Sequence, residues 1–182
     1  MKNIKTPIQL FKVYMNPNAK IEVGKTLDSG YIGQGSKVEE FEQKLNEYFN
    51  SDRVVTLNSG TSGVHLALHL LKKPLNITSA DGYSKNEKTW PGIQEKDEVL
   101  ATALTCTASN WPILANGLKI KWVDIDEKTL NMDLDDLERK ITSKTKAIIV
   151  VHWGGYPLDL DRLKKIQDKA FELYGFKPAI IE

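Results

Sequence analysis

The sequence is poor in cysteine, in long apolar runs and in excess charge of one sign. Its single cysteine, Cys106, allows no disulfide within the chain, and a cytoplasmic location is the simplest expectation. No apolar run approaches the roughly 20 residues of a membrane span, and the first residues lack a signal-peptide core. Lys and Arg number 25 against 24 Asp and Glu, a net charge of +1, so nothing indicates a nucleic-acid or membrane partner. A small anionic ligand stays compatible with this balance.

Short apolar segments alternate along the chain with amphipathic ones. Strands are predicted at residues 54–57, 98–102, 119–123, 147–151 and from 179 onward, and helices behind Ser36, from about Thr61, at 108–116, and behind the caps Asp133 and Asp159. The strands do not alternate in polarity, which indicates burial on both faces. The fold class is therefore α/β with a mostly parallel sheet.

Two stretches interrupt this pattern. Residues 1–35 are expected to form an N-terminal arm that ends in a glycine-rich segment, followed by the α/β domain over 36–182. Residues 72–97 hold Pro, Gly, Asn, Ser and Lys without periodicity, which predicts a long surface insertion. The sequence stops on an apolar strand, Pro178–Glu182, with nothing after it to cover that strand. We therefore expect the domain to be incomplete.

The segment after the first predicted strand carries the most specific ligand signal. Ligands of open α/β sheets bind at the carboxyl ends of the strands, and residues 58–63 read Asn-Ser-Gly-Thr-Ser-Gly. The glycines allow close backbone approach, and the helix that follows would offer free N–H groups to a phosphate. The alternative is an ordinary strand-to-helix turn with a Ser or Thr cap. The segment is neither a Walker A loop nor Gly-x-Gly-x-x-Gly.

Two further residues are candidates for chemistry at the same edge. His152 follows the most apolar strand and precedes Trp-Gly-Gly-Tyr-Pro. It could be a general base or a donor that positions a ring, or else a hydrogen-bonded residue that shapes the turn. Cys106 could be a nucleophile, but no His or Asp adjoins it in the sequence, so an inert small residue is favoured.

Two groups of residues have the spacing of metal ligands but not a complete ligand set. His65 and His69 lie four residues apart on a predicted helix, without the Glu of a His-Glu-x-x-His motif or a third ligand. Asp124, Asp126 and Glu127 lie close together but favour a solvated turn. No metal site is therefore predicted.

Several motifs, taken in order, resemble one enzyme family. They are Ser29–Gly35 with Val38–Glu42, Asn58–Ser62 with Leu66–Leu68, Asp97–Val99, Val123–Asp126, Thr145–His152 with Gly154 and Pro157, and Ile180–Glu182. Their order and spacing are similar to those of the DegT/DnrJ/StrS group of pyridoxal-phosphate-dependent sugar aminotransferases, from about residue 28 to the end. The resemblance implies a fold type I large domain, with three α/β/α layers and a mostly parallel sheet, that is truncated and lacks the C-terminal domain.

The resemblance also implies a chemistry and a set of binding residues. Pyridoxal 5'-phosphate (PLP) forms a Schiff base with a lysine, and a carboxylate on its pyridinium nitrogen makes the ring an electron sink. An amino group passes from an amino-acid donor, commonly glutamate, to a nucleotide-linked keto sugar. The implied cofactor-binding residues are Gly60, Thr61, Ser62, Thr105, Cys106 and His152, and the implied substrate-binding residues are Tyr31 and Gly33. Because the family's sites form at dimer interfaces, a homodimer is implied.

The chain departs from the family pattern in two places. Cys106 aligns with a position that is commonly aromatic, so either this branch of the family uses a smaller residue there, or Trp111 or another side chain covers the ring. The pyridinium aspartate and the Schiff-base lysine are expected beyond Glu182, so no catalytic residue is assigned in this chain, which should be inactive alone. The rivals are a sugar dehydratase of the same family that uses PLP or its amine form, a non-catalytic split half or binding module, and an unrelated α/β protein that binds another phosphate ligand.

Overall fold

A computed structural model describes residues 12–77 and 88–182. The chain divides into two compact units, Met1–Thr56 and Leu57–Glu182, and each is described by itself. The glycine-rich segment expected to end an arm at residue 35 lies within the first unit. Every helix among the described residues is too short or too polar to cross a bilayer.

The first unit contains the helices α1 (Ala19–Asp28) and α2 (Ser36–Phe49). The prediction that Ser36 caps α2 is wrong, because Gly35 holds the extended N-cap position and Ser36 is already helical. A Cβ atom on Gly35 would lie 2.9 Å from a ring carbon of Tyr31. This close approach explains a glycine immediately before the helix.

Residues 54–57 do not form the predicted strand. The amide of Val54 donates to Asn46 Oδ1 at 3.1 Å, and the amide and hydroxyl of Thr56 both donate to Glu42 Oε1 at 2.7 Å. Side chains of α2 therefore take the hydrogen bonds that a neighbouring strand would otherwise make. Val55 is 72% exposed, so the apolar run is not buried as a strand of the sheet would be.

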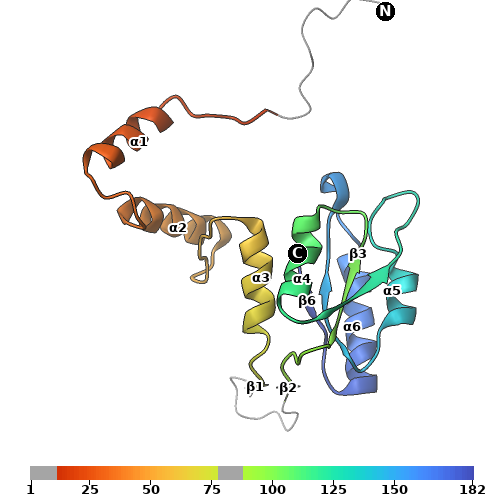
Figure 1. The fold of residues 1–182 in the computed structure, drawn as a ribbon. Helices are drawn as coiled ribbons and strands as arrows, with labels where there is room; N and C mark the ends of the chain where they lie inside the picture. Colours follow the sequence, from red (N-terminus) through yellow and green to blue (C-terminus); the bar gives the residue numbers. More distant parts are fainter. Residues whose placement is uncertain (1–11, 78–87) are drawn as a thin grey trace, which may run out of the picture. The chain divides into compact units, whose positions relative to one another are not determined.

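The second unit is an α/β domain around a four-stranded parallel sheet (Figure 1). Its strands are β3 (Glu98–Thr102), β4 (Lys119–Val123), β5 (Thr145–Ile149) and β6 (Ala179–Ile181), in the order β4–β3–β5–β6. Its helices are α3 (Gly60–Leu70), α4 (Thr107–Ala115), α5 (Leu134–Lys140) and α6 (Leu160–Tyr174), with a 3-10 turn, η1, at Trp153–Gly155. The predicted α/β class and parallel sheet are confirmed.

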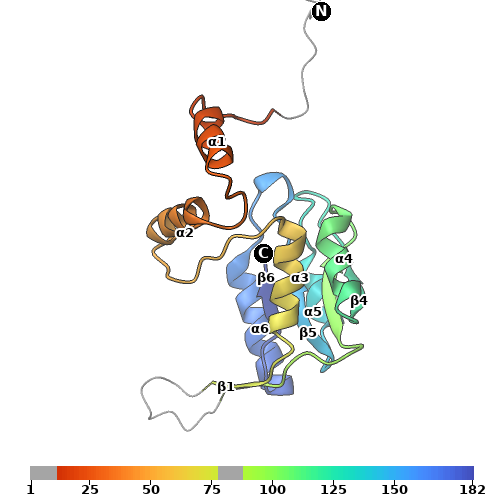
Figure 2. The ribbon, with the colours of Figure 1, turned by 60° about the vertical axis from the view of Figure 1, so that its left-hand side comes forward.

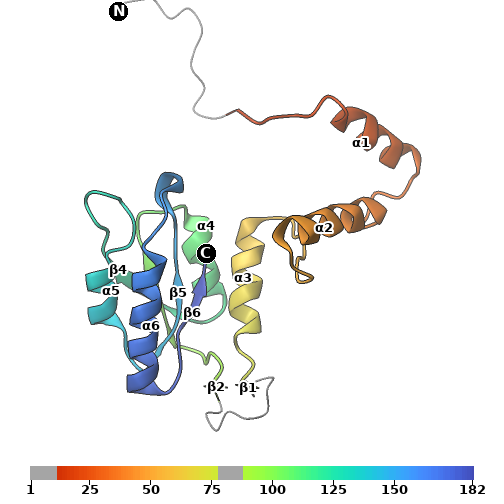
Figure 3. The same cartoon turned by 180° about the vertical axis from the view of Figure 1, so that it is seen from behind.

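The central strands are buried on both faces, which produces three layers. Val99 and Ala101 of β3 pack in a core cluster with Leu68 of α3 and Ile113 of α4. Leu100, between them in sequence, belongs to the opposite cluster with α5 and α6. Figures 2 and 3 show α3 and α4 on one side of the sheet and α5 and α6 on the other. Alternate residues of one short strand thus pack into two core clusters on opposite faces of the sheet, as the continuous apolar sequence of the strand predicts.

The region predicted as a surface insertion contributes to the core at its C-terminal flank. β1 (Leu75–Ile77) and β2 (Lys88–Trp90) form an antiparallel ribbon, and Trp90 and Ile93 are buried beside α3. The Trp90 indole donates to the Leu71 carbonyl at 2.8 Å. This flank therefore lies in the core and not on the surface, while residues 78–87 lie outside the described part of the chain.

Element ends in the second unit follow the predicted signals closely. Asp133 and Asp159 cap α5 and α6 by accepting backbone N–H groups, and Gly175 ends α6 in the left-handed region. The strands at 98–102 and 119–123 have their predicted bounds. β5 runs from Thr145 to Ile149, two residues earlier at each end than the predicted 147–151. Its first two residues, Thr145 and Lys146, are polar yet buried, so the apolar pattern did not include them.

Candidate functional site

The candidate site is the edge of the sheet where the parallel strands end. The segments after β3, β4, β5 and β6 all leave the sheet at this edge, because parallel strands share one direction. Figures 1 and 3 show the N-terminal ends of α3 and α4 at the same edge. The structure therefore collects here the segments that carry Gly60–Ser62, Thr105, Cys106 and His152, as the rule for open α/β sheets predicts.

The first turn of α3 has the geometry of an anion-binding site. Ser59 caps the helix by accepting the Ser62 amide at 3.2 Å, and its hydroxyl donates to Ser62 Oγ at 3.0 Å. Within the described residues, the amides of Gly60 and Thr61 have no acceptor. Nothing lies within 4 Å of a Cβ placed on Gly60, so the turn is open on that side. Free N–H groups at the positive end of a helix favour a phosphate.

A second group of polar side chains lies at the start of α4. The hydroxyls of Thr105 and Ser109 are 3.0 Å apart, and the exposed Cys106 occupies the N-cap position with an extended backbone. Cys106 makes no side-chain capping hydrogen bond. Trp111, considered as a possible ring cover, lies on α4 with 57% of its surface exposed.

Asn110 is a polar residue of this region that sequence analysis missed. Its amide donates to the carbonyl of Thr102, the last residue of β3, at 3.0 Å, while Asn110 Oδ1 is buried without a partner. The available signal was an asparagine inside a mostly apolar helix, where a polar group needs a partner. Asn110 ties α4 to the carboxyl end of β3.

His152 lies between the ends of β5 and β6. Its Nε2 is 3.1 Å from Glu182 Oε2, and its Nδ1 accepts the amide of Leu158 at 3.1 Å. The second contact closes the turn from 152 to 158, as the turn-shaping alternative predicts. The first joins two residues thirty positions apart and was not predicted.

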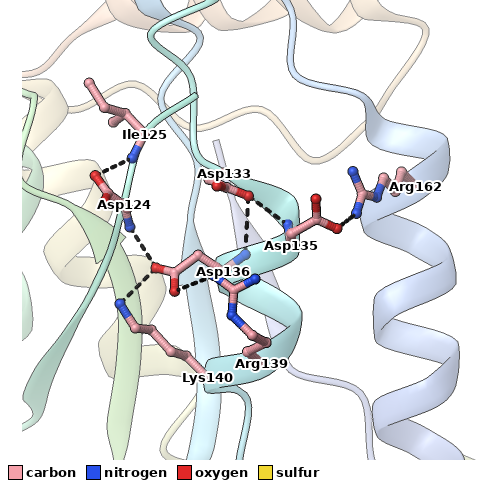
Figure 4. Close-up of polar contacts among 8 residues, drawn as sticks. All are labelled: Asp124, Ile125, Asp133, Asp135, Asp136, Arg139, Lys140 and Arg162. Atoms are coloured by element: carbon pink, nitrogen blue, oxygen red, sulfur yellow. Dashed lines mark hydrogen bonds and ion pairs between the residues drawn. The ribbon is translucent and has the colours of Figure 1, made fainter. Parts of the chain in front are cut away.

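The acidic residues after β4 hold a turn (Figure 4). Asp124 donates its amide to Asp136 Oδ2 at 2.8 Å and accepts the Ile125 amide at 2.8 Å. Asp126 accepts both the amide and the hydroxyl of Thr129, which hold the Asp126 pKa below its usual range. These carboxylates are engaged by the protein, as expected of a structural turn. The described residues contain no group of three or more His, Cys, Asp or Glu suited to a metal ion.

Asp136 is the buried centre of this acidic network. It lies on α5 and is only 7% exposed, with Lys140 at 2.7 Å and Arg139 at 3.2 Å. Burial raises the Asp136 pKa, but hydrogen bonds from Lys140 and the Asp124 amide outweigh it, so the pKa lies below its usual range. The ion pair between Asp135 and Arg162 at the same helix end is exposed (Figure 4).

The remaining candidates lie away from this edge or in the first unit. His65 and His69 are exposed on α3. Tyr31 and Gly33 belong to the first unit, where they line a cavity of about 300 Å³ together with Lys25 and Lys37. The Tyr31 hydroxyl donates to the Gln34 carbonyl at 2.8 Å, which fixes the ring over the glycine-rich segment.

The sequence matches a known family over most of its length. The DegT/DnrJ/EryC1/StrS aminotransferase family is matched by residues 14–172. The chain belongs to this family. The resemblance seen in the sequence motifs is thereby confirmed.

Solved structures of relatives share the fold. AtS13 from Actinomadura melliaura is 51% identical with a TM-score of 0.81, over 96% of this chain and 42% of AtS13. The sugar aminotransferase CalS13 from Micromonospora echinospora is 44% identical with a TM-score of 0.79, over 96% of this chain and 42% of CalS13. The GDP-4-keto-6-deoxy-D-mannose-3-dehydratase of E. coli, solved with bound hydrated PLP, is 26% identical with a TM-score of 0.70, over 86% of this chain and 37% of the dehydratase.

The match covers only part of the length of each relative. The chain spans between 31% and 38% of the length of five curated relatives of the DegT family. The predicted fold type I architecture is thus confirmed, and the chain covers less than half of the length of these relatives.

Proposed function

We propose that this chain is the N-terminal part of a PLP-dependent sugar aminotransferase. The observation that carries the proposal is the first turn of α3, where two free amides, two hydroxyls and a glycine meet at the ligand edge of a DegT-family fold. That donor set suits the phosphate of PLP. Similarity to CalS13, a sugar aminotransferase, supports the reaction class.

In this proposal the cofactor lies across the carboxyl edge. Gly60 and Thr61 hold its phosphate through their free backbone N–H groups and the Thr61 hydroxyl, and Ser62, whose amide is donated to Ser59, contributes its hydroxyl. Thr105 and Cys106 line its ring, and His152 forms a wall of the site. PLP supplies an electron sink for chemistry at the amino-bearing carbon. The E. coli dehydratase, a relative with bound hydrated PLP, supports this cofactor.

The proposed substrates are a nucleotide-linked keto sugar and an amino-acid donor, glutamate in the first instance. The nucleotide-linked sugar is supported by the name of the E. coli relative, because that name includes a GDP-linked keto sugar. We assign Tyr31 and Gly33 of the first unit to the sugar nucleotide. Support comes from the cavity that they line.

The catalytic lysine and the pyridinium aspartate are proposed to follow Glu182 in a longer protein, so that this chain is inactive alone. The partial coverage of the relatives supports this view. The test is the gene sequence after the codon for Glu182. An aspartate codon next, and a lysine codon further on, would support the proposal. An immediate stop codon with no partner reading frame downstream would contradict it.

A dehydratase is the second candidate, because one similar structure is a sugar 3-dehydratase. The two candidates differ in whether a lysine holds the cofactor. Borohydride treatment of the complete protein should fix PLP covalently in an aminotransferase. Release of all the cofactor on denaturation after that treatment would favour the dehydratase, and absence of cofactor would favour a non-catalytic split half.

The complete protein is further proposed to be a cytoplasmic homodimer. Support for a dimer comes from apolar side chains on the outside of α3 and α4, where Leu70, Trp111 and Leu114 are each more than half exposed. The lone cysteine supports the location. Light scattering should give twice the chain mass, and a monomer at micromolar concentration would contradict the dimer.

A further inference from the structure

Both ring nitrogens of His152 are engaged by the protein. Nδ1 accepts the backbone amide of Leu158 at 3.1 Å. Nε2 lies 3.1 Å from the Glu182 carboxylate, which can only accept when it is ionised. The ring therefore bridges its own turn after β5 to the end of β6.

These two contacts select one state of the imidazole. An amide N–H can donate only to an unprotonated nitrogen, so Nδ1 carries no proton. The remaining ring proton lies on Nε2, where it is donated to Glu182. Protonation of Nδ1 would break the Leu158 hydrogen bond, so the neutral Nε2-protonated tautomer satisfies both partners at once.

We propose that His152 is a positioning residue that acts through Glu182. With both nitrogens occupied, His152 has no atom left to bond a ligand directly. Glu182 is 46% exposed along its side chain, and its Oε1 makes no hydrogen bond to any described residue. The histidine thus holds one carboxylate oxygen of Glu182 toward the turn after β5. The other oxygen has no hydrogen-bond partner among the described residues. The consequence for cofactor binding rests on the proposed function, whereas the tautomer does not.

The first experiment reads the tautomer in the wild-type chain. The sequence has three histidines, and His65 and His69 are exposed on α3, so they serve as internal references. In 15N-labelled protein at about pH 8, above the ordinary histidine pKa, we expect a nitrogen–nitrogen coupling across the hydrogen bond from Leu158 to His152 Nδ1. A protonated His152 Nδ1, or no such coupling, would overturn the proposal.

The second experiment separates the two hydrogen bonds with a matched pair of variants. His152→Gln places a donor amide where Nε2 lies and keeps the bond to Glu182. His152→Asn places an acceptor where Nδ1 lies and keeps the bond to Leu158. If the residue acts through Glu182, the dissociation constant for PLP rises about tenfold in the Asn variant, the usual effect of losing a hydrogen bond to a charged group. The Gln variant should stay within about threefold of the wild type.

The outcomes distinguish this inference from the proposed function. Equal loss in both variants, or a greater loss in the Gln variant, would show that His152 serves only its turn and would overturn the positioning role. If the complete protein binds no PLP, the proposed function fails, and the nitrogen coupling and the Glu182 contact in the NMR spectra still decide how His152 is held.

Discussion

At the start of α3, the Thr61 hydroxyl and the neighbouring free amides are the groups that would bind a phosphate. Thr61→Val keeps the shape of the side chain and removes one donor. We expect it to weaken PLP binding by about 1–3 kcal/mol, the usual cost of removing a partner of a charged group. Fluorescence titration with PLP measures the change. Thr142→Val is the control, because its hydroxyl donates to Glu98 at the opposite end of the sheet, where β3 and β5 begin. An unchanged affinity in Thr61→Val would remove Thr61 from the proposed role.

The buried carboxylate of Asp136 predicts a pH-dependent stability. Its folded pKa lies below the usual range, so its contribution is complete above the unfolded pKa of about 3.9 and is lost as pH falls toward the folded value. Asp136→Asn should lower the free energy of unfolding by about 1–3 kcal/mol at pH 7. The difference from wild type should shrink below about pH 4.

Urea unfolding at pH 7 and near pH 3 measures this difference. Asp135→Asn on the same helix end is the control, since its pair with Arg162 is exposed and should contribute less than about 1 kcal/mol. An equal effect of the two variants at pH 7 would contradict the role given to Asp136.

The sequence could predict residues of the site where local spacing carries the signal. Gly60, Thr61 and Ser62 follow from a glycine and hydroxyl run before a helix, and the helix with its free amides is observed. The contact of His152 with Glu182 could not be predicted, because it depends on β5 and β6 being neighbours in the sheet. The buried, unpartnered oxygen of Asn110 likewise appears only once α4 packs on β3.

Two glycines with similar backbones at the ends of elements should respond differently to alanine. Gly92 and Gly175 both have φ of 77°. A Cβ on Gly175 meets nothing within 4 Å, whereas one on Gly92 would lie 2.6 Å from the Lys72 carbonyl oxygen. Gly175→Ala should cost only the left-handed strain of about 1 kcal/mol. Gly92→Ala should cost about 2–4 kcal/mol, because overpacking adds to that strain.

Thermal or urea unfolding of the two variants tests this comparison. Gly175→Ala serves as the matched control for the strain alone. Equal destabilisation would mean that the backbone around Gly92 shifts at little cost and that its packing against residues 72–74 contributes little to the free energy of unfolding.

At the level of elements, the fold is predictable where burial and capping are local. β3 and β4 have their predicted bounds, because a short apolar segment between polar turns predicts a strand and nothing else. Residues 54–57 have the same apolar pattern, yet side chains of α2 take their amides. The burial of the residues around Trp90 could not be predicted from composition, because their partners on and next to α3 lie about twenty residues earlier. The failures occur where a partner distant in the sequence decides the outcome.

At the scale of the whole molecule, the chain belongs to the DegT family, and its candidate site lies at one edge of the parallel sheet. Its α/β unit carries the first turn of α3, the turn before α4 and the His152–Glu182 pair, all at the edge of the sheet where the parallel strands end. It spans 42% of AtS13 and of CalS13. Cofactor binding therefore belongs to this unit in our account, whereas amino transfer requires residues that the proposal places after Glu182.

The central claim is that the first turn of α3 binds the phosphate of PLP. The most direct measurement compares PLP with pyridoxal, which lacks the phosphate, by titration of the complete protein. The account predicts that PLP binds at least about tenfold more tightly, since charge-assisted hydrogen bonds to an anion are lost in pyridoxal, and that Thr61→Val removes much of this difference. Equal affinity for the two compounds, or no saturable binding of PLP, would contradict it.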